Sequence, residues 1–245
     1  MTGPRPTEHR LGGGNIADVV RIGQRVHRTA PERGAYVHEL LTHLHQAGYG
    51  GSPRWHGHDE HGREILDYID GDVPWRSEQH AALRTPDSLT ALARLVRRLH
   101  DLTAGTALAA GGEVVCHHDL SPKNTVYRDG APVAFLDWDL AGPGRRVQDL
   151  AHVCWQWLDL GPDVTDVDTT ARLLAVLVDA YGLPDRRSLL PTVLWWQDRC
   201  RRGILDAAQR GVPAMVRLRE SGVPQRIGAA HDWTAAHADA LTAYL

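Results

Sequence analysis

The part of the chain that most constrains its fold is a polar loop set between short apolar runs, in residues 113–138. The runs cover residues 114–116, 125–127 and 133–136 and are rich in β-branched and aromatic side chains. Such runs, bounded by polar turn residues, are typical of β-strands. The stretch therefore predicts one strand that leads into a loop at 117–124 and a hairpin that leads out of it.

The pattern of the remaining chain changes near residue 72. Before it, strand-like runs at 17–22, 25–29 and 63–69 accompany one helical segment that opens at Pro31 and closes at Gly48. After it, apolar residues recur at helical spacing in segments that begin at Pro86 and cover 147–158, 168–181, 189–210 and 234–245. Strands first and helices later, with an embedded hairpin, predict an α+β fold with a small N-terminal lobe, 1–72, and a larger helical lobe, 73–245, that form one unit.

Charge and hydropathy exclude several classes of protein. The 245 residues carry a formal net charge of −3, which argues against general adhesion to nucleic acid or acidic lipid. No apolar run approaches the ~20 residues of a membrane span, and the polar N-terminus lacks the apolar core of a signal peptide. Three scattered cysteines are too few for a disulfide framework. We therefore expect a cytoplasmic protein that binds neither nucleic acid nor membrane, in an oligomeric state that the sequence leaves open.

Residues suited to chemistry concentrate in the polar loop and just beyond it. The loop reads His117-x-Asp119-x-x-x-x-Asn124, and a second acidic site, Asp137 and Asp139, follows the next apolar runs. One carboxylate is placed to receive a hydroxyl proton, while an amide and another carboxylate can hold Mg²⁺ on a nucleotide. Phosphoryl transfer to an alcohol needs these parts, because its catalysis is mostly positioning and charge neutralisation.

This segment resembles the aminoglycoside phosphotransferase and choline kinase-like family, within the protein kinase-like superfamily. The resemblance rests on His117, Asp119 and Asn124, on the sequence Leu-Asp-Trp-Asp at 136–139 and on the Asp-Leu-Ala element at 149–151. It implies a protein kinase-like two-lobe fold, with ATP and Mg²⁺ as cofactors and a small hydroxylated molecule as substrate.

The resemblance also implies roles for the residues around the reacting groups. Asp119 would orient the substrate hydroxyl and accept its proton, and Asn124 and Asp137 would ligate Mg²⁺. His117 would brace the loop rather than react, and Asp149 would hold the loop through its backbone N–H groups.

Two further segments would bind ATP if the resemblance holds. A glycine-rich loop would let backbone N–H groups approach the phosphates without obstruction by Cβ atoms. Its residues are Gly12, Gly13, Gly14 and Asn15. The segment 66–69 would line the adenine pocket. The backbone expected to hydrogen bond to the base belongs to Asp67, Tyr68 and Ile69.

The sequence departs from the family pattern where a lysine is expected. Arg28 stands on the third strand, at the place where the superfamily presents a cation to the α and β phosphates. Arginine keeps its charge and can bind phosphate through two N–H groups, so nucleotide binding is expected to persist. The carboxylate expected to orient Arg28 is Glu39, in the middle of the helix, with Glu32 as the second choice.

The only lysine of the chain, Lys123, lies beside Asn124, while the other 26 basic residues are arginines. Codon bias explains why lysine is rare. It does not explain why the one lysine lies inside the catalytic loop. The resemblance implies that Lys123 neutralises charge on the transferring phosphoryl group or faces the substrate cleft.

Several other residue groups have a structural and a functional interpretation. We expect Asp139 to bond a backbone group rather than to reach the metal through water. His56, His58 and His61 have the spacing of a metal cluster, but their Gly- and Asp-rich surroundings favour a solvated turn. Four tryptophans could form an aromatic wall for a ligand, although core packing is expected for at least half of them. They are Trp155, Trp157, Trp195 and Trp196.

The function that these patterns favour is an ATP-dependent phosphotransferase that moves the γ-phosphoryl group to a small-molecule hydroxyl. An aminoglycoside or another antibiotic is one acceptor class, and a sugar or amino alcohol is another. A non-catalytic nucleotide-binding module is the alternative from a different class. From residue 151 onward, eleven acidic residues face ten arginines, which gives no strong preference for a polycation. The acidic residues at 159, 163, 166 and 168 share one loop that could line a cleft.

Overall fold

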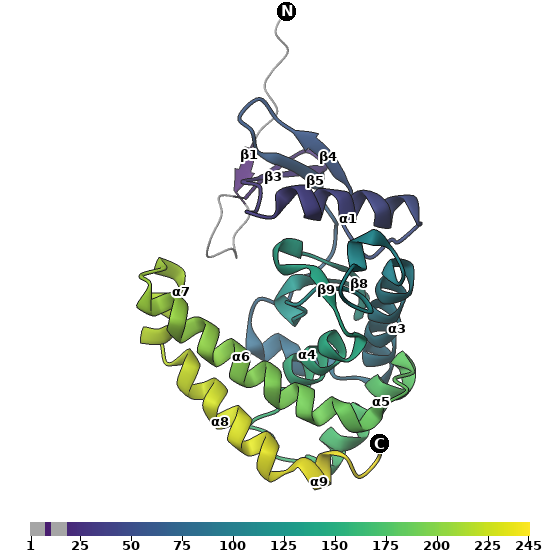
Figure 1. Cartoon of the computed structure of the whole chain (residues 1–245), viewed down its shortest axis with the longest axis vertical. Helices are drawn as coiled ribbons and strands as arrows, with labels where there is room; N and C mark the ends of the chain where they lie inside the picture. Colours follow the sequence, from purple (N-terminus) through teal and green to yellow (C-terminus); the bar gives the residue numbers. More distant parts are fainter. Residues whose placement is uncertain (1–7, 11–18) are drawn as a thin grey trace, which may run out of the picture.

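The computed structural model of the chain describes residues 8–10 and 19–245 and shows an antiparallel sheet with one helix above a larger helical part (Figure 1). The sheet has the strand order β1-β2-β3-β5-β4. Its strands are β1 Glu8–Arg10, β2 Val20–Ile22, β3 Arg25–Arg28, β4 Trp55–His58 and β5 Glu64–Asp67, and its helix is α1 Gly34–Gln46. This arrangement confirms the expected α+β fold with a β-rich first part.

The pairing of β3 with β5 determines which side chains of the sheet meet. Gly23 turns the chain between β2 and β3 with a φ of +61°, a conformation that favours glycine. β3 then pairs antiparallel with β5, and the register places Arg28 directly opposite Glu64. Directly opposed side chains on one face of a sheet lie close enough to form an ion pair.

The histidine-rich segment forms a strand, which corrects the expected solvated turn. His56 and His58 lie on β4, which pairs with β5, whereas His61 lies in the turn that follows. The ring of Trp55, at the start of β4, stacks on His38 of α1 with centroids 4.5 Å apart. The sequence Trp-His-Gly-His lacks the alternation that marks a strand, so the pairing partner and the stacking on α1 define this one.

The chain passes from the sheet to the helical part through a tight crossing beside β7. Gly71 has a φ of +144°, and a Cβ there would lie 2.6 Å from the carbonyl oxygen of Tyr127. Asp72 and Tyr127 then exchange two backbone hydrogen bonds of 2.8 and 2.9 Å. These hydrogen bonds fix the connection to β7, the strand that follows the polar loop.

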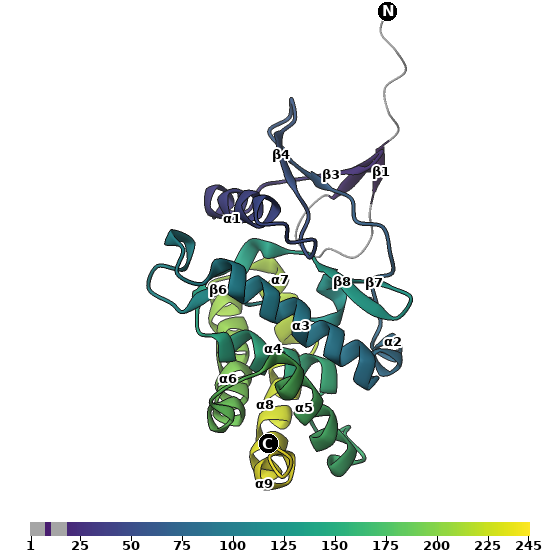
Figure 2. The same ribbon diagram turned by 90° about the vertical axis from the view of Figure 1, so that its right-hand side faces the viewer.

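The larger part of the molecule consists of amphipathic helices (Figure 2). One hydrophobic core runs through them and extends to α1 and β5. The side chain of Thr85 accepts a hydrogen bond at the start of α3, and the buried face of that helix carries leucine and valine at helical spacing, as expected. The helices are α2 Ser77–His80, α3 Pro86–Thr103, α4 Arg146–Leu158, α5 Val167–Tyr181, α6 Leu189–Gln209, α7 Pro213–Glu220, α8 Val223–Ala236 and α9 Ala238–Leu241. Among the described residues, no helix is long and apolar enough to cross a membrane.

The C-terminal helices differ from the expectation of one helix over 234–245. α7 was not expected, and α8 begins at Val223, eleven residues earlier than the expected helix. Pro213 and Pro224 occupy the first turns of α7 and α8, where a proline needs no N–H partner. Gly211 and Gly222 precede these helices with positive φ. The prolines and glycines were the signal for both starts.

Short strands surround the polar loop, as the apolar runs predicted. They are β6 Val114–Cys116, β7 Thr125–Arg128, β8 Ala131–Phe135 and β9 Gly142–Gly144. β7 and β8 form the expected hairpin, while β6 pairs with β9. β9 has the sequence Gly-Pro-Gly, and glycine and proline do not favour strands. It forms a strand because its backbone pairs with β6, which the sequence does not indicate.

Candidate active site

The loop that follows β6 is held in place by one buried carboxylate on α4. Asp149 accepts hydrogen bonds from the backbone N–H groups of His117, at 2.7 Å, and His118, at 2.9 Å. Burial alone would raise the pKa of Asp149, but its hydrogen bond and charge interaction with His100 hold that pKa below its ordinary value. The expected structural role of Asp149 is confirmed.

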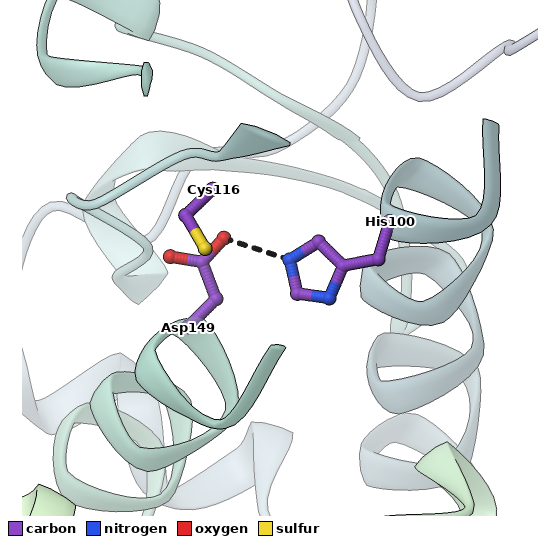
Figure 3. Close-up of side chains that lie close together, drawn as sticks. All are labelled: His100, Cys116 and Asp149. Carbon is purple, nitrogen blue, oxygen red and sulfur yellow. Dashed lines mark hydrogen bonds and ion pairs between the residues drawn. The ribbon is translucent and has the colours of Figure 1, made fainter. Parts of the chain in front are cut away.

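Asp149 also belongs to a buried group with His100 and Cys116 whose ligand atoms lie within 4.8 Å of one another (Figure 3). Each of these atoms already has a protein partner: His100 bonds Asp149 and the Tyr181 hydroxyl, and the Cys116 thiol donates to the carbonyl oxygen of Arg145. Burial raises the pKa of the Cys116 thiol well above its usual range, whereas a metal ligand must be a thiolate. The group fits a structural network that anchors the loop.

Asp119 and Asn124, five residues apart in the loop, are in direct contact. The Asn124 amide nitrogen donates to the Asp119 carboxylate at 2.8 Å and to the Asp119 carbonyl oxygen at 3.0 Å. Burial raises the pKa of Asp119 to about 6, although the charge of Lys123 opposes the shift. A carboxylate with a raised pKa is a better proton acceptor near neutral pH.

Asp137 follows the end of β8 and lies near enough to Asp119 to act on its charge. The N–H of Leu136, one residue earlier, donates to the carbonyl oxygen of Asn124 at 2.8 Å. The His117 ring bonds the carbonyl oxygen of Leu136 at 3.0 Å and packs on Trp138, which confirms its bracing role. Asp137 itself has a φ of +61°, a strained conformation for a residue other than glycine. Its side chain is half-exposed, and its charge acts on Asp119.

Arg28 joins the sheet to these carboxylates. Its Nε donates to Glu64 at 2.6 Å, and its two terminal nitrogens reach Asp137, at 3.4 Å, and Asp139. Asp139 was expected to bond a backbone group; the structure instead pairs it with Arg28. A guanidinium with several N–H donors is suited to bridge carboxylates in this way.

The carboxylate that orients Arg28 is Glu64, which corrects the expectation of Glu39 or Glu32. Glu64 is fully buried, and its second oxygen bonds His38 of α1 at 2.6 Å. α1 therefore still contributes to the position of Arg28, but through a histidine. Glu39 and Glu32 are exposed, and Glu39 lines a cavity of about 600 Å³ bounded by α1, β4 and residues 106–108. Glu64 could have been found only from the pairing of β3 with β5, which places it opposite Arg28.

Residues 9–192 match the phosphotransferase enzyme family. The chain belongs to this family. A relative from Rhizobium leguminosarum bv. trifolii, named trifolitoxin immunity protein, is 33% identical over 200 residues, which cover 71% of this chain and 73% of the relative. Membership in the phosphotransferase family makes the chain a small-molecule phosphotransferase.

Solved structures share the two-lobe, kinase-like fold of this family member. One is a choline/ethanolamine kinase family protein from Mesorhizobium loti, with a TM-score of 0.63 and 19% identity, covering 99% of this chain and 93% of that chain. Another is a macrolide 2'-phosphotransferase from Brachybacterium faecium, with a TM-score of 0.56 and 16% identity, covering 93% and 91%.

The segments expected to bind ATP are only partly described. Gly12, Gly13, Gly14 and Asn15 lie outside the described residues, so their role stays a prediction. Three residues were expected to hydrogen bond to adenine through their backbone. The N–H of Asp67 already donates to the carbonyl oxygen of Arg54, and the N–H of Tyr68 donates to that of Gln24. Ile69 is the one whose N–H has no partner within the described parts of the chain.

The tryptophans mostly belong to the core of the helical part. Trp155, Trp157 and Trp196 are buried, whereas Trp195 remains 40% exposed. The Trp157 indole N–H donates to the Tyr127 hydroxyl, and that of Trp196 to the carbonyl oxygen of Gln148. Core packing therefore accounts for three of the four.

Proposed function

We propose that this protein transfers the γ-phosphoryl group of Mg-ATP to a hydroxyl of a small molecule. The observation that carries the proposal is the pairing of Asp119 with Asn124, together with Asp137, which acts electrostatically on Asp119 and is contacted by Arg28 of the sheet. A proton acceptor, oxygen ligands and a phosphate-binding cation are the parts that phosphoryl transfer requires.

The residues present fit a magnesium ion. The Asn124 nitrogen is used on Asp119, so its amide oxygen remains for a metal. Asp137 follows Leu136, whose N–H donates to the Asn124 carbonyl oxygen, and its carboxylate is half-exposed. Amide and carboxylate oxygens are ligands that Mg²⁺ accepts. Bound Mg²⁺ would neutralise charge on the phosphates of the nucleotide. Arg28 would bind the α and β phosphates, the loop Gly12–Asn15 would cover them, and Ile69 would hydrogen bond to the base.

Asp119 would position the acceptor and take its proton. As the hydroxyl proton moves to the carboxylate, the hydroxyl oxygen forms a bond to the γ-phosphorus. The bond from that phosphorus to the bridging oxygen breaks, and ADP leaves. Lys123, which is exposed next to Asn124, would stabilise negative charge on the phosphoryl group during transfer.

We further propose that the acceptor is an antibacterial compound, which the modification inactivates. The relative at 33% identity is named an immunity protein, which supports this assignment over a metabolic role. A choline/ethanolamine kinase family protein of similar fold supports keeping amino alcohols as the competing class.

An acceptor screen that measures release of ADP from ATP, or of GDP from GTP, tests the proposal. The panel would hold antibacterial compounds, sugars and amino alcohols, each with ATP or GTP and Mg²⁺. We expect acceptor-dependent ADP release with at least one antibacterial compound and much less with choline or ethanolamine. The opposite order would assign a metabolic role. Nucleotide binding without ADP release for any acceptor would favour the non-catalytic module.

A further inference from the structure

One side of α6 faces the catalytic loop. The Trp196 indole is fixed against α4 by its 2.6 Å hydrogen bond to the carbonyl oxygen of Gln148, and its ring centroid lies 5.8 Å from that of His118. One turn further along, burial and then the charge of Asp119 raise the pKa of the Cys200 thiol to about 11. Trp196 and Cys200 therefore mark the side of α6 that meets the loop. α6 packs against α4, the helix that holds the loop (Figure 1).

The carboxylates of α6 lie away from this side. Asp198 is two residues from both Trp196 and Cys200, which places it roughly 160° around the helix from each. It forms ion pairs with Arg201, at 3.1 Å, and Arg202, at 2.8 Å. Asp206 lies beyond Cys200 and roughly 120° around the helix from it. α6 thus brings no carboxylate to the loop.

Cations occupy the rim of the same side. The Arg199 guanidinium carbon lies 5.5 Å from the centroid of the buried Trp196 ring and 5.3 Å from that of the exposed Trp195. Lys123 is exposed on the loop and acts electrostatically on Asp119. Arg199 and Lys123 both carry a positive charge near neutral pH.

Three of the four acidic residues in the loop after α4, which could have lined a cleft for a cation, are used elsewhere. Asp159 pairs with Arg84, and Asp166 accepts hydrogen bonds from Thr169 as the N-cap of α5. Asp168 bonds Arg172 at 3.0 Å and the Tyr244 hydroxyl near the C-terminus. These carboxylates hold α5 and the end of the chain together.

We propose that the acceptor is neutral or anionic where it meets α6, and that a polycation is rejected there by Arg199 and Lys123. The inference rests on the proposed phosphotransfer, because it assigns the acceptor to the space beside Asp119. A ligand with several ammonium groups needs carboxylates to replace its water, and like charges placed together oppose its binding.

A charge series on one scaffold tests the inference. The probes are 4-nitrophenyl β-glucuronide, β-glucoside and β-glucosaminide, which carry −1, 0 and +1 near neutral pH, together with gentamicin as a polycation. Binding to the full chain is measured by titration calorimetry with Mg²⁺ and a non-hydrolysable ATP analogue, and turnover by ADP release with ATP. We expect affinity to fall along the series from glucuronide to glucosaminide, by about tenfold overall, with gentamicin weakest.

A pair of charge reversals assigns the preference to this side of α6. Arg199→Glu is expected to abolish or invert the order of the series. Arg202→Glu makes the same charge change on an exposed residue roughly 60° further from Cys200 and is expected to keep that order. An unchanged series in Arg199→Glu would contradict the inference.

The two readouts separate this inference from the proposed function. Ordered binding without ADP release for any probe supports the acceptor class and counts against phosphotransfer. Gentamicin phosphorylated at least as well as the glucuronide upholds phosphotransfer and overturns the acceptor class. Binding of no probe, or equal binding across the series, also overturns it.

Discussion

At the scale of single residues, Arg28 stands where the superfamily usually has a phosphate-binding lysine. Buried Glu64 bonds Arg28, and His38 bonds Glu64 in turn. Removing the charge of Glu64 while keeping its shape should loosen Arg28, because a hydrogen bond between charged groups contributes about 1.5–3 kcal/mol. Glu64→Gln is therefore expected to raise the KM for ATP roughly tenfold or more. Steady-state kinetics at saturating acceptor would measure it.

Glu39→Gln is the matched control for this change. It makes the same substitution on an exposed residue of α1 that does not contact Arg28. Its KM for ATP should stay within about twofold of the wild type, as for surface substitutions in general. If Glu39→Gln raised KM and Glu64→Gln did not, the assignment of Glu64 would be wrong.

Lys123 and Arg28 are expected to differ in the kinetic constant that they control. Arg28→Ala removes a contact to bound nucleotide and should chiefly raise the KM for ATP. Lys123→Ala removes a charge that acts on the transferring group and should lower kcat more than it changes that KM. A near-wild-type kcat in Lys123→Ala would show that Lys123 does not act on the transferring group and that its place in the loop has no catalytic meaning.

At the scale of elements, α4 fixes the catalytic loop through one carboxylate. Asp149→Asn puts an amide NH₂ against one of the two loop N–H groups, so a buried donor loses its partner. We expect the free energy of unfolding to fall by about 3 kcal/mol, measured by urea denaturation. Asp163→Asn, an exposed change in the loop after α4, should leave it within about 0.5 kcal/mol.

The same carboxylate makes stability depend on pH. The pKa of Asp149 is lower in the folded state than its ordinary value of 3.8, so its contribution is complete above that value. As pH falls below about 4, proton uptake by the unfolded chain removes the contribution. The stability difference between wild type and Asp149→Asn should therefore shrink from pH 6 to pH 3. A difference that stays constant over this range would contradict the charged state of Asp149.

Elements with local patterns could be predicted from the sequence, and those defined by distant partners could not. The apolar runs at 114–116 and 125–127 and the stripe of α3 were recognised, since period and turn residues mark them. β4 and β9 were missed because pairing, not side-chain alternation, defines them. Glu64 was missed because it meets Arg28 across 36 residues of sequence. Asp119, Asn124 and Asp137 were singled out by their spacing and by the family resemblance that rests on it, and the structure brings Asp119 and Asn124 into contact. Their catalytic and metal-binding roles stay predictions.

At the scale of the whole molecule, Arg28 of the sheet contacts Asp137 and Asp139 of the helical part. Mg-ATP would bind residues of both parts at once and should stabilise the folded chain. A ligand at 100 times its Kd adds about 2.7 kcal/mol, which corresponds to a Tm rise of roughly 8 °C for a chain of this size. ATP with EDTA is expected to give a much smaller rise in a thermal shift experiment. Equal rises would count against Asn124 and Asp137 as metal ligands.

The central claim is that Asp119 receives the proton of an acceptor hydroxyl during phosphoryl transfer. The most direct measurement is the single-turnover rate of γ-phosphoryl transfer from labelled Mg-ATP to the best acceptor, in the wild type, Asp119→Asn and the control Asp163→Asn. We predict a fall of about 10²- to 10⁴-fold in Asp119→Asn, with an unchanged thermal shift by Mg-ATP, and wild-type rates in the control. Transfer by Asp119→Asn within twofold of the wild-type rate would contradict the account.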